Sequence, residues 1–110
     1  MIGIHDPNLS QSEFQEVLEA LQSNWISGGG AKVRAFELEV QRFLGSKHSP
    51  VAAVNGSSAL LLALRALGVS SGEHVLVSAY GFVATANAVS FAGASPIFVG
   101  PERGDDPVVN

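Results

Sequence analysis

The second half of the chain alternates short runs of small or β-branched apolar residues with alanine-rich segments. The runs are VAAV at 51–54, HVLVSA at 74–79 and SPIFV at 95–99, and the segments between them lie at 59–67 and 82–93. Short apolar runs of this kind are typical of buried parallel strands, and the segments between them have the composition of helices. The order strand, helix, strand, helix, strand predicts two βαβ units that share one parallel sheet, and therefore an α/β fold.

Two amphipathic helices are expected before the sheet. The first lies within 10–24, where Ser10 stands three residues before Glu13 as in a capping box, and its apolar face is formed by Phe14, Val17, Leu18 and Leu21. The second lies at 31–45 and ends at Gly45. Between them the glycines at 28–30 predict a loop or a close backbone approach, because glycine loses the most conformational freedom on folding.

The composition excludes several function classes. Hydrophobic residues make up 46% of the 110 residues and charged residues 15%, which suits a packed interior and argues against disorder. The net charge of -4 and the scattered lysines and arginines leave no basic stripe for nucleic acid. The chain has no cysteine and only three distant histidines, which disfavours a metal site or a thiol nucleophile. Without a long apolar run or a signal pattern, we expect a cytoplasmic protein with no membrane contact.

The sequence NGSS at 55–58 stands between the first expected strand and the helix after it. In a βα unit this turn lies at the carboxyl edge of the sheet, where the free N–H groups of the helix carry a partial positive charge. Gly56 lets an anionic group approach the backbone, and Ser57 and Ser58 each offer an N–H and a hydroxyl. The pattern has two interpretations: a phosphate cradle, or a helix start at which Ser57 only caps the helix and Gly56 only makes the turn, as these residues do at most helix starts.

Aromatic residues accompany both glycine-containing loops. Tyr80 and Phe82 follow the second expected strand, so we expect them at the same edge of the sheet as NGSS, where an aromatic ring either stacks on a flat ligand or belongs to the core. Trp25 stands just before the glycine loop at 28–30, and its ring either lines a pocket or is a buried anchor. The helix at 59–67 has Arg65 as its only charge, so it needs cover on most sides, more than the elements of this chain supply.

Four segments, taken in order, resemble the N-terminal part of the DegT/DnrJ/EryC1/StrS family of pyridoxal-phosphate-dependent sugar aminotransferases. They are NWISGGGAKVRAFE, KHSPVAAVNGSSALLLALRALGV, GEHVLVSAYGFVATANAV and GASPIFV. The resemblance covers about residues 18–99. It implies two helices and then βαβαβ, as part of the three-layer αβα large domain of the type I aspartate-aminotransferase fold. It also implies that residues 1–110 form a single truncated N-terminal segment of that domain.

The resemblance implies roles for particular residues. Ser57 and Ser58, with Gly56 before them, match the residues that hold the cofactor phosphate. Phe82 matches the aromatic residue that stacks on the pyridine ring. Five further residues match positions that in some members lie along the sugar-nucleotide site: Asn24, Trp25, Ile26, Ser27 and Asn55.

The sequence also departs from the family pattern. The family uses a lysine that forms a Schiff base, downstream of the stacking aromatic residue, whereas Lys32 and Lys47 both precede NGSS. Gly100 stands where many members have aspartate, and PERGDDPVVN at 101–110 follows the family poorly. No residue of this chain is therefore assigned a catalytic role, and we expect the chain alone to be inactive.

These observations leave three hypotheses. The first is the opening part of an enzyme that moves an amino group from glutamate to a nucleotide-linked keto-sugar, with pyridoxal phosphate as cofactor, which a fragment of this length need not bind. The second is a self-associating interaction module without catalysis, because the apolar helix and a sheet with open edges favour a homodimer or larger homo-oligomer. The third is a generic phosphate-binding α/β domain.

Overall fold

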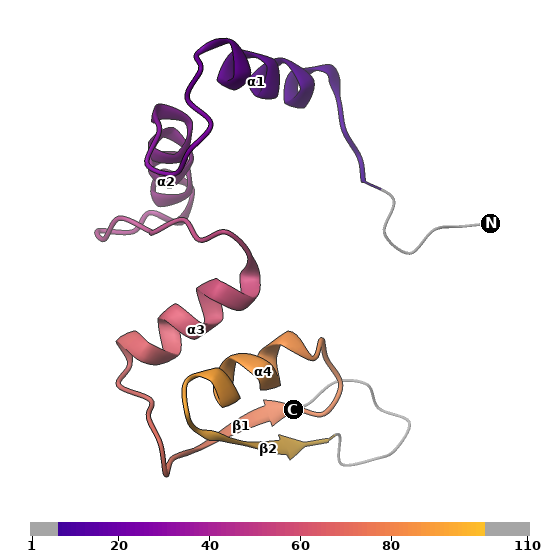
Figure 1. Ribbon diagram of the computed structural model, residues 1–110, viewed down its shortest axis with the longest axis vertical. Helices are drawn as coiled ribbons and strands as arrows, with labels where there is room; N and C mark the ends of the chain where they lie inside the picture. Colours follow the sequence, from indigo (N-terminus) through magenta and orange to yellow (C-terminus); the bar gives the residue numbers. More distant parts are fainter. Residues whose placement is uncertain (1–6, 101–110) are drawn as a thin grey trace, which may run out of the picture. The chain divides into compact units, whose positions relative to one another are not determined.

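Four helices and two strands follow one another as α1, α2, α3, β1, α4 and β2 in residues 7–100, the part of the chain that the computed structural model describes (Figure 1). The chain divides after Ala52 into two units. The first unit holds α1 and α2, and the second holds the remaining elements. The predicted α/β class with a parallel sheet is confirmed.

Both helices of the first unit begin and end where their sequence signals predict. In α1 (Gln11–Gln22) the capping box is formed, since the Ser10 N–H donates to Glu13 Oε2 at 2.6 Å. Hydrogen bonds from Ser10 lower the pKa of the Glu13 carboxyl. Helix α2 (Ala31–Leu44) ends at Gly45, whose φ of 60° is the left-handed conformation that glycine adopts at no steric cost.

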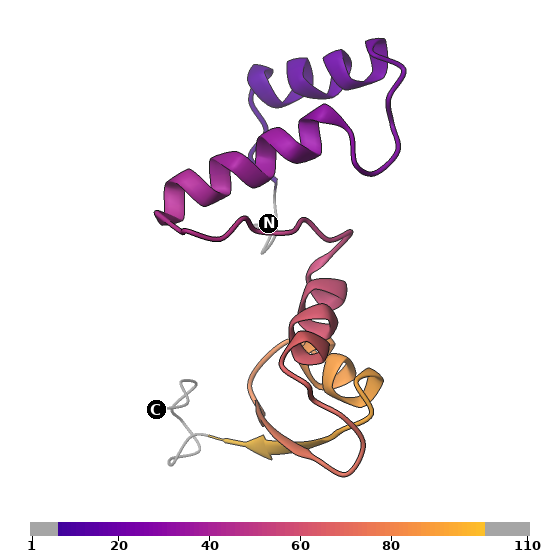
Figure 2. The ribbon, with the colours of Figure 1, turned by 90° about the vertical axis from the view of Figure 1, so that its left-hand side faces the viewer.

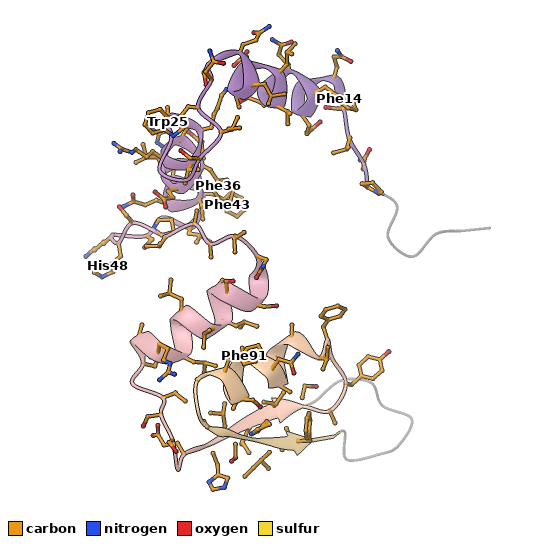
Figure 3. The ribbon with its side chains drawn as sticks, in the orientation of Figure 1. Phe14, Trp25, Phe36, Phe43, His48 and Phe91 are labelled. Carbon is orange, nitrogen blue, oxygen red and sulfur yellow. The ribbon has the colours of Figure 1, made fainter. Side chains whose placement is uncertain are left out.

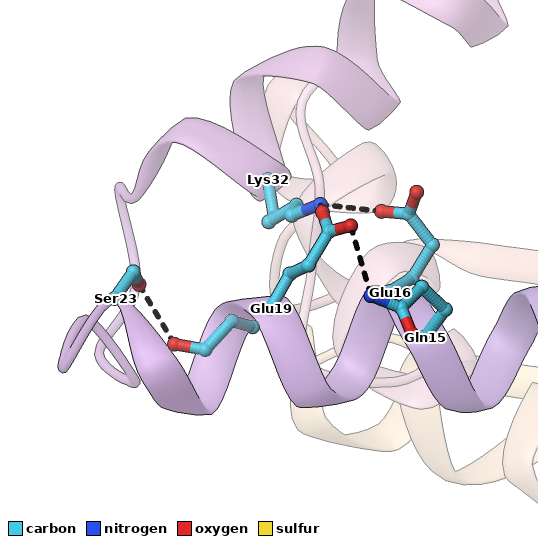
Figure 4. A network of polar contacts seen from close by, with 6 residues as sticks. Gln15, Glu16, Glu19, Ser23 and Lys32 are labelled. Carbon is cyan, nitrogen blue, oxygen red and sulfur yellow. Dashed lines mark hydrogen bonds and ion pairs between the residues drawn. The ribbon is translucent and has the colours of Figure 1, made fainter.

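An ion-pair cluster joins α1 to α2. The Nζ of Lys32, at the start of α2, lies 2.6 Å from Glu16 Oε2 and 2.8 Å from Glu19 Oε2 (Figure 4). Gln15 donates to Glu19 from the preceding turn of α1 at 3.3 Å. These contacts raise the pKa of Lys32, chiefly through the hydrogen bond to Glu16, and the hydrogen bond from Lys32 lowers the pKa of Glu19.

The second unit is a two-stranded parallel sheet covered by helices on one face. Strands β1 (His74–Ser78) and β2 (Ser95–Val99) pair in register, and α4 (Ala84–Phe91) packs against both strands while α3 (Gly56–Ala66) packs against α4 (Figures 1 and 2). The core is formed by Val77, Val89 and Ala94, with four partly buried side chains against it: Leu64, Val69, Val75 and Ala86.

The expected strand at 51–54 is absent from the described residues, so the prediction of a third strand is wrong. The backbone N–H of Ala52 donates instead to Glu37 Oε1 of α2 at 2.8 Å, so it is unavailable to a neighbouring strand. Val51 and Val54 are exposed and pair with neither β1 nor β2. A run of apolar residues becomes a strand only where another strand satisfies its backbone groups.

Many large apolar side chains are exposed in both units. Four of the side chains labelled in Figure 3 are Phe14, Phe36, Phe43 and Phe91, and each is more than half exposed. Neither α1 nor α2 has a fully buried residue. The expectation that helix 59–67 needs further cover fits the exposure of Leu60, Leu62 and Leu67. Within 7–100, no helix is long and apolar enough to cross a membrane.

Candidate functional site

The first turn of α3 lies within the sequence NGSS. The helix begins at Gly56, three residues earlier than the predicted start at 59. Asn55 is its N-cap, because Asn55 Oδ1 accepts the backbone N–H of Ser58 at 2.8 Å. The alternative interpretation of Ser57 as the cap is therefore wrong, since Ser57 is the second residue of the helix itself. Asparagine at the N-cap satisfies one of the N–H groups that a helix start leaves without a partner.

The other donors of this turn have no partner among residues 7–100. They are the backbone N–H groups of Gly56 and Ser57 and the hydroxyls of Ser57 and Ser58. Asn55, Gly56 and Ser57 are exposed, and Ser58 is half-buried. Free N–H groups at a helix start attract anions because the helix dipole adds to their partial positive charge. The turn can therefore donate several hydrogen bonds to one phosphate.

Gly56 keeps the approach to this turn open. A Cβ built at Gly56 meets no atom within 4 Å, and its φ is not positive. Neither the backbone nor the packing of the described chain therefore requires glycine here, although alanine favours a helix more than glycine does. The space that a Cβ would enter lies beside the free N–H groups. This donor set and this open space fit a phosphate group.

The loop after β1 lies at the same end of the second unit as the start of α3 (Figure 1). Tyr80 and Phe82 belong to this loop by their positions in the sequence. The Ser78 hydroxyl donates to the carbonyl oxygen of Tyr80 at 2.9 Å and accepts the Tyr80 N–H at 3.2 Å, which fixes the turn. Tyr80 is 69% exposed and Phe82 is 82% exposed. These rings do not belong to the core of this unit, and so the Phe82 ring is free to contact a flat ligand.

The remaining candidate residues, Asn24 to Ser27, lie in the first unit. Asn24 has a φ of 58°, and Trp25 lies against Gly30, where a Cβ would stand 2.6 Å from Trp25 Cδ1. The close backbone approach expected at the three glycines therefore occurs at Gly30.

A cavity of about 590 Å³ opens between α1, this loop and the start of α2. Its lining is largely apolar, with Val17, Leu21, Trp25, Ile26 and Val33. Glu19 and Lys32 supply charge at the same cavity. The sequence analysis did not identify this charged pair, because its members stand 13 residues apart and no local pattern connects them.

The structure brings together Asn55, Gly56, Ser57 and Ser58 at the start of α3, and Phe82 stands in the same unit. His48 and His74 are exposed, and His5 lies outside the described residues. No group of three or more metal-ligating side chains occurs within 7–100.

Comparisons with known proteins show the family of this chain. The model of the DegT/DnrJ/EryC1/StrS aminotransferase family matches residues 7–105. The spore coat polysaccharide biosynthesis protein SpsC of Bacillus subtilis is 44% identical over 84% of this chain and 23% of its own length. The dTDP-4-dehydro-2,3,6-trideoxy-D-glucose 4-aminotransferase of Saccharopolyspora spinosa is 38% identical over 89% of this chain and 26% of its own length.

A solved structure extends the agreement to three dimensions. NtdA from Bacillus subtilis, with bound cofactor PMP, matches with a TM-score of 0.69 and 30% identity, over 82% of this chain and 21% of NtdA. The predicted type I fold is thereby confirmed. Pyridoxal phosphate, the cofactor that the resemblance implies, is also the cofactor named for a relative from Bacillus subtilis, the putative pyridoxal phosphate-dependent aminotransferase EpsN, which is 37% identical over 92% of this chain and 26% of its own length. The chain spans about a quarter of the length of the relatives that it matches. Because the family model covers all of its described residues and its fold is shared, the chain belongs to the DegT/DnrJ/EryC1/StrS aminotransferase family.

Proposed function

We propose that this chain supplies the phosphate-binding turn of a pyridoxal phosphate pocket in a sugar aminotransferase. The reaction is the transfer of an amino group from glutamate to a nucleotide-linked keto-sugar. The observation that carries the proposal is the start of α3, where two backbone N–H groups and two serine hydroxyls have no partner within 7–100 and Gly56 leaves open space beside them.

In this proposal each residue has a defined task. Gly56 and Ser57 donate their backbone N–H groups, and Ser57 and Ser58 donate their hydroxyls, to the cofactor phosphate. The exposed ring of Phe82 covers one face of the cofactor and excludes water from it. The cofactor, when bound, supplies the electron-withdrawing ring on which amino transfer depends.

We do not assign amino transfer to these 110 residues by themselves. Lys32 lies within 2.8 Å of two carboxylates, and this contact raises its pKa and keeps its amine protonated. We therefore assign Lys32 to the contact between α1 and α2 and not to the reaction.

The substrate side of the proposal involves the first unit. We propose that Asn24, Trp25, Ile26 and Ser27 contact the sugar nucleotide. The resemblance gives the same task to Asn55. Trp25 is 60% exposed at the edge of the apolar cavity, and an exposed indole ring offers a stacking surface for a base or a sugar.

Gly56→Ala tests the phosphate site. The added methyl enters the space that the phosphate needs, so we expect the affinity for pyridoxal phosphate, followed by ligand absorbance, to fall about tenfold, which corresponds to about 1.4 kcal/mol. The helix itself should be as stable as before, because alanine favours a helix. Inorganic phosphate should compete with pyridoxal phosphate, and pyridoxal without its phosphate should bind weakly. Gly28→Ala is the matched control, since Gly28 also faces open space but lies in the first unit.

Two outcomes would contradict the proposal. The first is an unchanged affinity for pyridoxal phosphate in Gly56→Ala, which would mean that the phosphate binds at another place. The second concerns Phe82→Ala: if it leaves pyridoxal phosphate and inorganic phosphate binding equally unaffected, the turn is a generic phosphate site with no aromatic cover.

The exposed apolar side chains favour a second candidate function, a self-associating interaction module. Leu76 on β1 is 69% exposed, and Phe98 on β2 is 61% exposed. Apolar surface of this kind is normally buried against a partner. A homo-oligomer would bury this apolar surface. A self-associating interaction module does not require a cofactor.

A further inference from the structure

Asn55 is followed directly by Gly56, and this pair of residues has a reactivity of its own. The carboxamide carbon of an asparagine, Cγ, is an electrophile, and the backbone nitrogen of the next residue can attack it and close a ring. A side chain on that next residue hinders the attack, and glycine has no side chain. Asn55 and Gly56 are both exposed, so water reaches them.

The backbone nitrogen of Gly56 is not held by another group of the described chain. Its N–H has no hydrogen-bond partner among residues 7–100. A Cβ at Gly56 would meet no atom within 4 Å, so the space beside this residue is open. Attack by this nitrogen on Asn55 Cγ therefore breaks no hydrogen bond of Gly56 and displaces no neighbouring side chain.

The other three asparagines within 7–100 lack this combination. Asn8, Asn24 and Asn87 are followed by leucine, tryptophan and alanine, whose side chains hinder the backbone nitrogen. The N–H of Trp25 also donates to Ser23 Oγ at 3.2 Å. Asn87 lies inside α4, where the helix fixes the backbone. These three asparagines therefore serve as controls within the same chain.

We infer that Asn55 is a site of spontaneous deamidation. In the first step a bond forms between the Gly56 nitrogen and Asn55 Cγ, the bond from Cγ to Nδ2 breaks, and the amide proton of Gly56 leaves with Nδ2 as ammonia. Water then opens the cyclic imide: attack at Cγ gives aspartate, and attack at the backbone carbonyl carbon gives isoaspartate. Each product carries a negative charge that asparagine lacks. The reaction needs no cofactor and is independent of the proposed function.

The N-cap hydrogen bond of α3 slows this reaction. Asn55 Oδ1 accepts the Ser58 N–H at 2.8 Å, which holds the carboxamide on the first turn of the helix. Ring closure turns the carboxamide toward the Gly56 nitrogen, and the hydrogen bond opposes that rotation. Deamidation is therefore faster in the unfolded chain than in the folded one. Of the two products, aspartate caps a helix as well as asparagine does.

Long incubation of the 110-residue chain at neutral pH tests the inference. The tryptic peptide 48–65 contains Asn55 as its only asparagine, and deamidation raises its mass by about 1 Da. We expect this increase well before any at the other three asparagines. The same peptide from Asn55→Asp is the standard that distinguishes aspartate from isoaspartate by retention time.

Gly56→Ala should slow deamidation at Asn55 about tenfold, because the methyl group hinders the nitrogen; this factor corresponds to about 1.4 kcal/mol of activation free energy. In urea strong enough to unfold both chains, both rates should rise and the ratio between them should persist. The comparison in urea separates hindrance at the nitrogen from any change in the stability of α3.

Three results would contradict the inference. If Asn55 keeps its amide as long as the other three asparagines do, it is not a preferred site. If Gly56→Ala reacts in urea as fast as the unsubstituted chain, the Gly56 nitrogen is not the nucleophile, and direct hydrolysis by water accounts for the product. Equal rates at Asn55 in the folded and the unfolded chain would overturn the protective role of the cap.

Discussion

At the scale of single residues, two glycines have opposite surroundings. A Cβ at Gly30 would stand 2.6 Å from Trp25 Cδ1 and 2.9 Å from Trp25 Nε1, whereas a Cβ at Gly56 would meet nothing within 4 Å. Gly30 is therefore required by a contact inside its own unit. Gly56 is required by no contact and no positive φ in the described chain.

Gly30→Ala should displace the indole ring of Trp25, because the new methyl would overlap it. Trp25 is the only tryptophan, so its fluorescence reports on this contact directly. We expect emission at longer wavelength and stronger quenching by acrylamide. Gly28→Ala, where the methyl enters open space, should leave both unchanged. An unaltered spectrum in Gly30→Ala would mean that the ring does not rest on Gly30 in solution.

At the scale of elements, the contact between α1 and α2 depends on charge. Lys32 is held by Glu16 and Glu19, and all three side chains are about half exposed or more, so water and salt screen the pairs. The lowered pKa of Glu19 means that its contribution is present above its ordinary pKa and is lost as the pH falls. The raised pKa of Lys32 means that its contribution is present below its ordinary pKa and is lost at alkaline pH.

Lys32→Gln should therefore lower the stability of the chain slightly at neutral pH and low salt. The difference from the unsubstituted chain should shrink as the pH falls below the ordinary pKa of a glutamate, because Glu19 becomes protonated, and as the pH rises above the ordinary pKa of a lysine, because Lys32 becomes neutral. Urea midpoints of both chains, measured by circular dichroism from acid to alkaline pH, would show how the stability difference changes. Arg42→Gln is the control, because it breaks the pair with Glu39 inside α2 and leaves α1 untouched. A difference that does not change with pH would contradict the ion-pair explanation.

Most element boundaries could be predicted from local sequence. The capping box at Ser10, the glycine stop at Gly45 and the strands at 74–79 and 95–99 all follow from patterns within a few residues, and the structure confirms them. The prediction of a strand at 51–54 is wrong because the Ala52 N–H donates to the carboxylate of Glu37, 15 residues earlier in the chain. No local pattern contains that contact.

The candidate site was predictable only in part. The serines and glycine of NGSS indicated a phosphate turn, but the sequence did not show that the helix already begins at Gly56 and that Asn55 caps it. Serine and asparagine are equally good caps, so composition alone does not choose between them. The choice depends on where the helix starts, which tertiary packing decides.

At the scale of the whole molecule, exposed apolar surface predicts self-association. Sedimentation velocity should show species larger than the monomer at micromolar concentration. Leu76→Lys should shift the distribution toward monomer, since it places a charge on exposed apolar surface of β1. His74→Lys, also exposed on β1, is the control and should leave the distribution unchanged. A folded monomer at these concentrations would contradict this prediction.

The core of the second unit consists of small side chains, and this has a calorimetric consequence. Its fully buried residues are Val77, Ala88, Val89, Ala92 and Ala94. The heat capacity gained on unfolding is proportional to the apolar area that becomes exposed to water, and valines and alanines expose little. The change in heat capacity when this unit unfolds should therefore be small, and its stability curve should be shallow between cold and warm conditions.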